Sequence, residues 1–489
     1  MSAPWQKDGY EAVIGLEIHV QLNTASKMFC SCPNRYGDEP NTNVCMVCLA
    51  HPGALPVANA EAVRQSARVG LALGCRIPDT SEFSRKQYFY PDSPKAYQIS
   101  QYDQPLCAEG VFHVPGEDAF TVGITRAHLE EDAAKMIHAG GDGGRISGSA
   151  GSVVDFNRVG TPLLEIVTEP DIRSPEDARR FLTLLRATVI AIGASECDME
   201  KGSLRADANV SIRPIGATEY GTKTELKNMN SFRFLERGIE AELDRQLALI
   251  KAGEAVQQET LHFDPATGTL SSLRSKEEAH DYRYFPEPDL LPVTQDQDDL
   301  AALAGQLPEL PVARFSRLTG AGLPEATALL LATEPELAAY YDDLAERVGD
   351  AKVAANWVLG EFQAHLNADG LTADASPVTP ERLAGLVALV VDGAINQTSA
   401  KEVFAALVED PAATAAGVVE ARDLAQVGGA DELGAIVDAV LAAHPDEVEA
   451  FRGGREQVIG FLVGQCMKQS GGRADAKALQ ALLRERLAG

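Results

Sequence analysis

The stretch IGLEIHVQL, residues 14–22, alternates apolar and polar side chains with a period of two. Such alternation is typical of a β-strand with one face on the core and the other on solvent or a ligand. The apolar face comprises Ile14, Leu16, Ile18, Val20 and Leu22. The opposite face carries Glu17, His19 and Gln21, so the strand belongs to a sheet whose polar face holds groups capable of chemistry.

Four further segments show the same period and place charged side chains on one face. They are 125–131 with Arg126, His128 and Glu130; 163–169 with Glu165 and Glu169; 204–212 with Arg205, Asp207 and Asn209; and 222–227 with Lys223, Glu225 and Lys227. Antiparallel sheets often leave one face in water, so any one of these strands is also compatible with a plain solvated face.

The composition and residue spacing of the 489-residue chain change after residue 294, just after a break marked by prolines at 286–292. Alternating strands, glycine and aromatic residues dominate 1–294, with a helix expected after the capping box SPED at 174–177. Alanine, leucine and glutamate at helical spacing dominate the remainder. We therefore predict an α+β fold: an antiparallel-sheet domain over 1–294, a helical domain over 295–409 and a small helical tail over 410–489.

Bulk composition indicates a water-soluble globular protein, with 45% hydrophobic and 23% charged residues. The N-terminal sequence lacks the basic-then-apolar pattern of a secretory signal, and the longest apolar stretch, 383–391, is too short for a bilayer. We expect a cytoplasmic protein with no membrane partner.

The net charge of −28 by itself argues against nucleic-acid binding, because phosphate contacts need Lys and Arg. The segment 455–489 reverses the trend, with six basic residues against three acidic ones. A basic terminal module on an acidic body is compatible with an RNA-contacting tail. A helix pair with a mixed, solvated surface explains the charge equally well.

Carboxylates recur on several of the predicted strands: Glu17 beside His19, the run Glu130-Glu131-Asp132, and Glu165. Adjacent carboxylates repel one another unless a cation, Lys or Arg neutralises them. Carboxylate oxygens with an occasional imidazole suit Mg²⁺, which keeps phosphate oxygens in its coordination shell. The pattern favours a magnesium site over a solvated face.

The segment RKQYFYPDSPKAYQISQY, residues 85–102, interleaves aromatic and basic side chains, and DYRYFPEPD at 281–289 resembles it. Such a stretch can hold phosphates or a nucleotide, although an edge strand followed by a turn would also explain it. No G-x-x-x-x-G-K-[ST] motif is present, so a P-loop ATPase is unsupported. We expect the nucleotide to contact Arg85, Tyr88, Arg205 and Glu225.

Four of the eight cysteines form two close pairs, Cys30-x-Cys32 and Cys45-x-x-Cys48, with twelve residues between the pairs. Two thiolate pairs joined by a short loop match tetrahedral Zn²⁺ geometry. Free thiols or a redox pair are the alternatives. A four-thiolate zinc has no open position, so it would hold the loop and take no part in catalysis.

Long motifs throughout the chain resemble the B subunits of the bacterial GatCAB tRNA-dependent amidotransferases. They are VIGLEIHVQL (13–22), SKMFCSC (26–32), RKQYFYPDSPKAYQISQYDQP (85–105), ITRAHLEEDA (124–133), GTPLLEIVTEPDIRSPEDA (160–178), KGSLRADANVSIRP (201–214), TELKNMNSF (224–232), DYRYFPEPDL (281–290) and GFLVGQCMKQSGGRAD (460–475). The resemblance covers essentially the whole chain.

The resemblance implies a cradle domain related in fold to glutamine synthetase, a helical domain and a YqeY-like tail. It implies a glutamine-dependent ligase that amidates misacylated Asp-tRNA(Asn) or Glu-tRNA(Gln). ATP would phosphorylate the aminoacyl side chain, and ammonia would then displace the phosphate. The implied partners are an amidase subunit that supplies ammonia, a small third subunit, and the tRNA, whose outer part the helical domain and tail would hold.

The family's magnesium site carries over onto Glu17, His19, Glu130 and Glu165, with Glu131 beside it. Lys86 and Lys95 match lysines at the ammonia entry. The four cysteines match zinc ligands that some members have and others lack, which implies a structural zinc. A non-catalytic RNA-binding scaffold and a free-standing ligase resembling glutamine synthetase are the competing interpretations.

Overall fold

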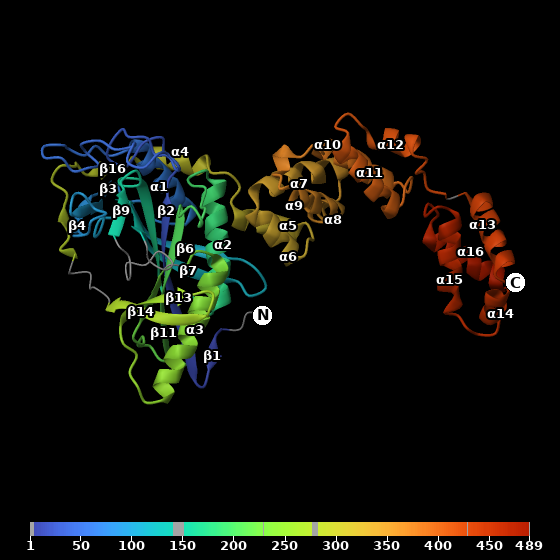
Figure 1. Ribbon diagram of the computed structural model, residues 1–489, viewed down its shortest axis with the longest axis horizontal. Coiled ribbons are helices and arrows are strands. Elements are labelled where there is room, and N and C mark those ends of the chain that lie inside the picture. The colour runs from blue at the N-terminus through green and yellow to red at the C-terminus, as the bar shows by residue number, and fades with distance from the viewer. Residues whose placement is uncertain (1–3, 140–150, 228, 276–281, 428, 489) are drawn as a thin grey trace. The chain divides into compact units, whose positions relative to one another are not determined.

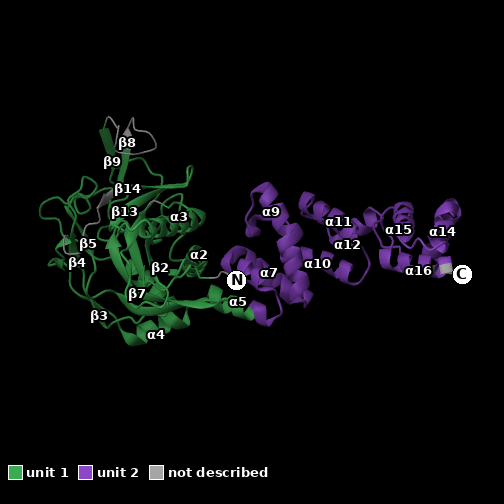
Figure 2. Cartoon of the chain, turned by 90° about the horizontal axis from the view of Figure 1, so that it is seen from below, with its two compact units in different colours: residues 1–317 green, residues 318–489 purple. Residues whose placement is uncertain are grey.

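The computed structural model describes residues 4–139, 151–227, 229–275, 282–427 and 429–488. The chain divides into two compact units, Met1–Arg317 and Leu318–Gly489 (Figure 2). The first contains the described strands, and the second is helical, so the predicted order of a sheet region followed by a helical region is confirmed.

A nine-stranded sheet forms the first unit, with strand order β14-β13-β12-β11-β2-β10-β7-β6, and β1 paired to β2 outside this path. The strands are β1 (Gln6–Lys7), β2 (Tyr10–Gln21), β6 (Cys107–Val114), β7 (Phe120–Glu131), β10 (Pro162–Thr168), β11 (Leu204–Pro214), β12 (Thr224–Lys227), β13 (Glu259–Asp264) and β14 (Thr269–Ser275). The alternating segment at residues 14–22 therefore lies mostly in β2, an interior strand between β10 and β11.

The sheet departs from the expected antiparallel arrangement at one of its described pairs. β12 and β13 run parallel, whereas the other described pairs of this sheet are antiparallel. The helix α3 (Phe232–Lys251) lies between these two strands in the chain, and a helical crossover is what a parallel pair requires.

Three helices pack on one face of the sheet: α1 (Ala60–Ala72), α2 (Pro175–Ala191) and α3 (Figure 1). The predicted capping box starts α2, because the Ser174 side chain accepts a hydrogen bond from the Asp177 N–H and Pro175 occupies the first turn. The apolar side chains of β2, such as Ile14 and Ile18, are fully buried. The other face of β2 is therefore left for the polar side chains.

Shorter strands complete the first unit. A three-stranded sheet has the order β15-β4-β5, from β4 (Ser84–Gln87), β5 (Tyr97–Ser100) and β15 (Phe285–Pro286). β3 (Thr80–Ser81) pairs with β16 (Val293–Thr294), and β8 (Lys135–Ala139) pairs with β9 (Gly151–Asp155). Strands from the two aromatic segments, far apart in sequence, thus meet in one small sheet.

Helices account for the rest of the described chain. They are α4 (Gln297–Gly305), α5 (Pro311–Gly320), α6 (Glu325–Thr333), α7 (Pro335–Val348), α8 (Ala351–Trp357), the π-helix Val358–Phe362, α9 (Gln363–Asp369), the 3₁₀ turn Ala373–Ala375, α10 (Pro380–Val391), α11 (Gln397–Glu409), α12 (Ala415–Ala421), α13 (Ala430–Ala443), α14 (Pro445–Arg452), α15 (Val458–Gln469) and α16 (Ala476–Ala488). Within the described ranges, no helix combines the length and the apolar character that a bilayer crossing demands.

The last four helices share a small core that includes Val437, Leu462, Cys466 and Leu483. The helices α15 and α16 form a hairpin, and its turn uses Gly471 and Gly472 with φ of 62° and 80°. α4 falls within the first compact unit although the sequence assigns it to the helical domain. The three-part division at 294 and 409 remains a prediction.

Candidate active site

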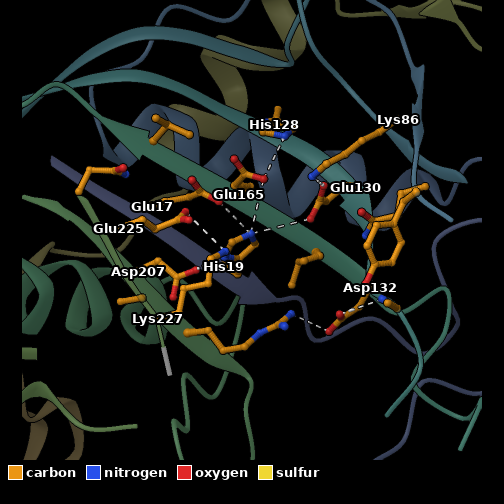
Figure 3. A pocket seen from close by; sticks show the side chains of 18 of the residues that line it. Glu17, His19, Lys86, His128, Glu130, Asp132, Glu165, Asp207, Glu225 and Lys227 are labelled. Carbon is orange, nitrogen blue, oxygen red and sulfur yellow. Dashed lines mark hydrogen bonds and ion pairs between the residues drawn. The ribbon is translucent and has the colours of Figure 1, made fainter. Parts of the chain in front are cut away.

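A cavity of about 760 Å³ lies over the polar face of the large sheet. Its floor comes from β2, β7, β10, β11 and β12, and its rim includes residues of both aromatic segments (Figure 3). The charged and aromatic residues that line it include Glu17, His19, Lys86, Tyr88, Asp92, Arg126, His128, Glu130, Asp132, Glu165, Arg205, Asp207, Glu225, Lys227, Tyr282 and Tyr284. The polar strand faces predicted from sequence therefore surround one space.

Strand register explains why these side chains meet. Across the sheet, Arg205 lies opposite His19, His19 opposite Glu165, and Glu165 opposite His128. Directly opposed residues point to the same face, and period two brings Glu17 and Glu130 to that face from the adjacent positions. Four residues from four strands thus form one row across the cavity floor.

The other three expected magnesium ligands surround His19 (Figure 3). His19 Nε2 lies 3.7 Å from Glu17 Oε1, 4.0 Å from Glu130 Oε1 and 3.5 Å from Glu165 Oε2. The candidate ligand atoms of Glu17, His19 and Glu165 lie within 4.8 Å of one another, as do those of His128, Glu130 and Glu165. The separation is short enough for these side chains to share cations.

The charges in the cluster are strongly coupled. Burial, together with the Glu165 charge, raises the pKa of Glu17 and of Glu130. Burial also opposes ionisation of Glu165, but the His128 and His19 imidazoles and the Lys86 ammonium hold its pKa well below its usual range. Burial alone would lower the pKa of His19, yet Glu165 and Glu17 raise it to about 9. The carboxylates thus retain a proton on His19 where no metal compensates them.

This donor set fits a hard divalent cation. Three carboxylates and an imidazole supply oxygen ligands and one nitrogen, and Glu130 and Glu165 are nearly inaccessible to solvent. Such buried carboxylates require a compensating positive charge. Lys86 supplies one such charge, since its Nζ lies 3.8 Å from Glu130 Oε2, and a divalent cation would supply the rest.

Glu131 and Lys95 are paired with each other away from the cavity lining. Lys95 Nζ lies 2.5 Å from the Glu131 carboxylate, which also accepts a hydrogen bond from the Ile99 N–H at 3.0 Å. Because Glu131 follows Glu130 on the same strand, its side chain points to the opposite face of the sheet. The pair therefore lies behind the carboxylate cluster.

The expected nucleotide-binding residues separate into two groups. Arg85 does not line the cavity: its Nε and Nη2 donate to the two Glu287 oxygens at 2.7 and 2.8 Å, and its guanidinium packs on the Tyr97 ring. The two hydrogen bonds between Arg85 and Glu287 hold β15 against β4. Tyr88, Arg205 and Glu225 do line the cavity, where Arg205 pairs with Asp132 at 2.8 Å.

Several lining residues were not among the expected site residues: Arg126, His128, Asp132, Asp207 and Lys227. The period-two pattern had placed Arg126, His128, Asp207 and Lys227 on polar strand faces, and Asp132 ended the predicted carboxylate run, so the signal for all five was present. Lys227 Nζ lies 3.3 Å from Asp207 Oδ2 and 3.5 Å from Glu225 Oε1. Lys227 therefore places a positive charge on β12, between the carboxylates of Asp207 and Glu225.

The four cysteines of the two-pair motif also converge. One sulfur from each of Cys30, Cys32, Cys45 and Cys48 lies within 4.8 Å of the others. Cys45 N–H donates to Cys48 Sγ at 3.1 Å, an arrangement that favours a thiolate there. The cluster fits a metal ion held by four sulfurs, as the spacing of the cysteines had predicted.

Comparisons with known proteins agree with these features. Residues 12–301 match the family described as the GatB/GatE catalytic domain, and residues 339–487 match the GatB domain. The B subunit of aspartyl/glutamyl-tRNA(Asn/Gln) amidotransferase from Moorella thermoacetica is 49% identical over 98% of this chain and 100% of its own length. The protein of the same name from Trichlorobacter lovleyi is 48% identical over the same shares.

A plant relative shows a similar extent of likeness. The chloroplastic/mitochondrial B subunit of glutamyl-tRNA(Gln) amidotransferase from Physcomitrium patens is 46% identical over 99% of this chain and 86% of its own length. These matches confirm the resemblance that the sequence motifs indicate. The chain therefore belongs to the GatB family, the B subunits of aspartyl/glutamyl-tRNA(Asn/Gln) amidotransferases.

Proposed function

We propose that this protein amidates misacylated Asp-tRNA(Asn), Glu-tRNA(Gln) or both, as a glutamine-dependent ligase that forms carbon–nitrogen bonds with consumption of ATP. The carrying observation is that Glu17, Glu130 and Glu165, from three strands, each place a carboxylate oxygen within 4.0 Å of His19 Nε2 in a large cavity. Family membership supplies the reaction, and the cavity supplies a place for it.

The chemistry requires activation, because a carboxylate does not lose hydroxide to ammonia. In the proposed sequence, an oxygen of the aminoacyl side-chain carboxylate attacks the γ-phosphorus of ATP, and ADP leaves. Ammonia then attacks the acyl carbon of the acyl phosphate, phosphate leaves, and the surplus proton passes to a base. Two anions must be brought together in the first step, so the site has to provide positive charge and fixed geometry.

Glu17, His19, Glu130 and Glu165 would hold Mg²⁺, which supplies charge neutralisation for the phosphate and carboxylate oxygens when bound. Lys86 partly offsets the burial that raises the pKa of Glu130, and it contacts two partners, Glu130 and the Tyr282 ring. Arg205 and Lys227 present positive charge on the β11 and β12 side of the cavity. Glu225 on β12 and Tyr88, which follows β4, are the other proposed contacts of the nucleotide. Arg85 contributes by clamping the cavity rim.

Ammonia would reach the acyl group past Lys86, Lys95 and Glu131. The support is positional: the Lys95–Glu131 pair lies directly behind Glu130, on the other face of the same strand. A carboxylate at that point can accept a proton from ammonium, which leaves neutral ammonia free to attack. A separate amidase subunit would release the ammonia from glutamine, and a small third subunit would complete a heterotrimer.

The remaining parts have proposed roles outside the chemistry. The first unit would be the cradle, related in fold to that of glutamine synthetase, and would hold the acylated end of the tRNA. The helical residues and the YqeY-like tail would hold its outer part. Zn²⁺ on Cys30, Cys32, Cys45 and Cys48 would stabilise the loop that carries them. We place the enzyme in the cytoplasm.

The test uses the enzyme reconstituted with its amidase and small partner subunits. Glu17→Ala and His19→Ala should abolish ATP hydrolysis that depends on misacylated tRNA, whereas tRNA binding should persist. Normal turnover in either variant would refute the assignment of the site. ATP hydrolysis that never depends on misacylated tRNA would favour a scaffold, and amidation of a small carboxylate without tRNA would favour a free-standing ligase.

A further inference from the structure

His128 is a buried imidazole at the end of the row of opposed residues that crosses the cavity floor. It lies on β7 directly opposite Glu165, and its Nε2 is 3.5 Å from Glu165 Oε2 (Figure 3). His19 Nε2 approaches the same oxygen atom from the other side, also at 3.5 Å. One carboxylate oxygen therefore stands between two imidazoles, and the two need not have the same role.

Arg126 distinguishes the two imidazoles. Its Nε donates a hydrogen bond to His128 Nδ1 at 3.3 Å, from two residues earlier on the same face of β7. A guanidinium has only N–H donors, so the nitrogen that meets it must offer a lone pair. His128 Nδ1 therefore carries no proton, and the N–H of the neutral ring is at Nε2, which faces Glu165.

We infer that His128 is a positioning residue: it donates its Nε2–H to Glu165 and so orients this carboxylate, while Arg126 fixes the tautomer. An Nε2 that carries hydrogen has no lone pair for a cation. The cluster would then contain one metal-binding imidazole, His19, and one orienting imidazole, His128. This inference rests on the proposed function, because it takes Glu165 to be a metal ligand.

The alternative is that His128, Glu130 and Glu165 hold a cation of their own, since their ligand atoms lie close enough. That arrangement needs the lone pair at Nε2 and the proton at Nδ1, where it would point at the Arg126 guanidinium. The observed hydrogen bond opposes that tautomer. Outer groups that orient a ligating carboxylate typically account for roughly 10- to 100-fold in metal affinity.

The experiment measures Mn²⁺ binding to the reconstituted complex by electron paramagnetic resonance, with no nucleotide or tRNA present. Mn²⁺ prefers oxygen ligands, so the four-sulfur cluster contributes little signal. His128→Leu removes the donor and should weaken Mn²⁺ binding by about 10- to 100-fold. His128→Gln keeps an N–H at the position of Nε2 and should stay within about threefold of the parent, whereas His128→Asn, whose amide is too short, should resemble His128→Leu.

A second arm tests the role of Arg126. Arg126→Met should weaken Mn²⁺ binding in the parent protein, and it should have less than about a threefold effect when His128 is already Gln, because an amide N–H needs no tautomer. Far-UV circular dichroism and tRNA binding verify that each variant is folded.

Two results would overturn the inference. One is that His128→Gln weakens binding as strongly as His128→Leu; the other is that both variants bind one Mn²⁺ fewer per chain, as loss of a direct ligand requires. Failure of the proposed function itself looks different. In that case the parent complex would show no Mn²⁺ binding that depends on Glu17 and His19.

Discussion

Glu165 lies directly opposite His19 in the antiparallel pair of β10 and β2, and the facing atoms Oε2 and Nε2 are 3.5 Å apart. The contact joins residues far apart in the chain through strand register alone. A slip of one residue in this pairing would move Glu165 to the core face, where its carboxylate would be buried among apolar side chains. The apolar faces of both strands prevent the slip, so the same residues that build the core also fix the site.

The buried Lys95–Glu131 pair should be sensitive to the loss of one partner only. Lys95→Met leaves a buried carboxylate without its counter-charge and should lower the free energy of unfolding by about 3–5 kcal/mol, whereas the double variant Lys95→Met/Glu131→Gln should lose much less. Urea unfolding followed by Trp5 fluorescence measures this in a Trp357→Phe background, in which the remaining tryptophan lies in the first unit. Losses that simply add in the double variant would contradict a coupled pair.

If that double variant is stable, it also tests the ammonia entry. Glutamine-dependent amide formation should fall more than amide formation from added ammonium chloride, because only the former needs delivery through the complex. Equal losses with both nitrogen sources would argue against a role of the pair in ammonia entry.

Replacement of Arg85 by Lys should loosen the cavity rim. Lysine cannot form the two parallel bonds to Glu287, and the loss of one charge-assisted bond is worth about 1.5–3 kcal/mol. The exposed Arg283 lies next to this clamp, so trypsin should cleave after it roughly tenfold faster or more. Arg76→Lys, which alters an exposed pair with Glu109 at 3.9 Å, is the matched control and should leave the rate unchanged.

In the metal-free first unit, the stability that His128 and His19 together contribute should be greatest near pH 6.5. Burial, together with nearby cations, lowers the pKa of His128 from 6.5 to about 4. Between pH 6.5 and pH 4 the unfolded chain therefore binds a proton that the folded chain does not bind, so the free energy of unfolding falls toward pH 4. The pKa of His19 is raised to about 9, so the folded chain holds a proton above 6.5 that the unfolded chain has lost, and stability falls again toward pH 9.

Each full unit of pKa difference is worth about 1.4 kcal/mol. The measurement is the same fluorescence-monitored urea unfolding, in EDTA, between pH 4 and 9. His128→Gln should flatten the acid limb and His19→Asn the alkaline limb. A variant that leaves its own limb unchanged would show that the titration arises elsewhere.

Charge reversal on the tail should weaken tRNA use without changing the chemistry. Arg473 and Arg486 already pair with Asp423 and Asp438, whereas Lys468, Lys477 and Arg484 are exposed. Reversing each of these three to Glu should raise KM for tRNA, lower the salt dependence by about one unit per charge and leave kcat intact. Lys251→Glu, on α3, is the control.

These point variants are preferable to deletion of 455–489. That deletion would remove α15 and α16 and expose the apolar residues of α13 that pack on them, such as Val437. An unchanged KM in the triple charge variant would exclude an RNA role for the positive charge of the tail.

The cysteine cluster should retain about one zinc per chain, detectable by elemental analysis of the purified protein. Cys48→Ser removes a ligand and should abolish zinc retention against a chelator and lower the thermal stability of the first unit, while amidation by the folded fraction persists. If the parent protein held less than one zinc per chain and still had full activity and stability, a structural role for zinc would be refuted.

Alternation along the strands predicted the sheet and placed Glu17, His19, Glu130 and Glu165 on polar faces, and the family resemblance selected these four from a set that also included Glu131 and Asp132. It could not show that Arg85 serves the rim, because its partner Glu287 lies 202 residues away and no local spacing encodes that contact. His128 was placed on a polar strand face but was given no role for a related reason: a histidine on an alternating strand is equally compatible with solvent, a ligand or another side chain. Its role depends on which residues the neighbouring strand places opposite.

The place of β2 in the sheet has a consequence for biosynthesis. Its two main neighbours, β10 and β11, begin at Pro162 and Leu204, so the ribosome must add well over a hundred residues before β2 can pair beyond Tyr10 and Glu11, which lie opposite β1. During that interval most of an amphipathic strand remains unpaired along both edges, which is a hazard for aggregation. The nascent chain therefore gains from chaperones that shield this strand until its partners emerge.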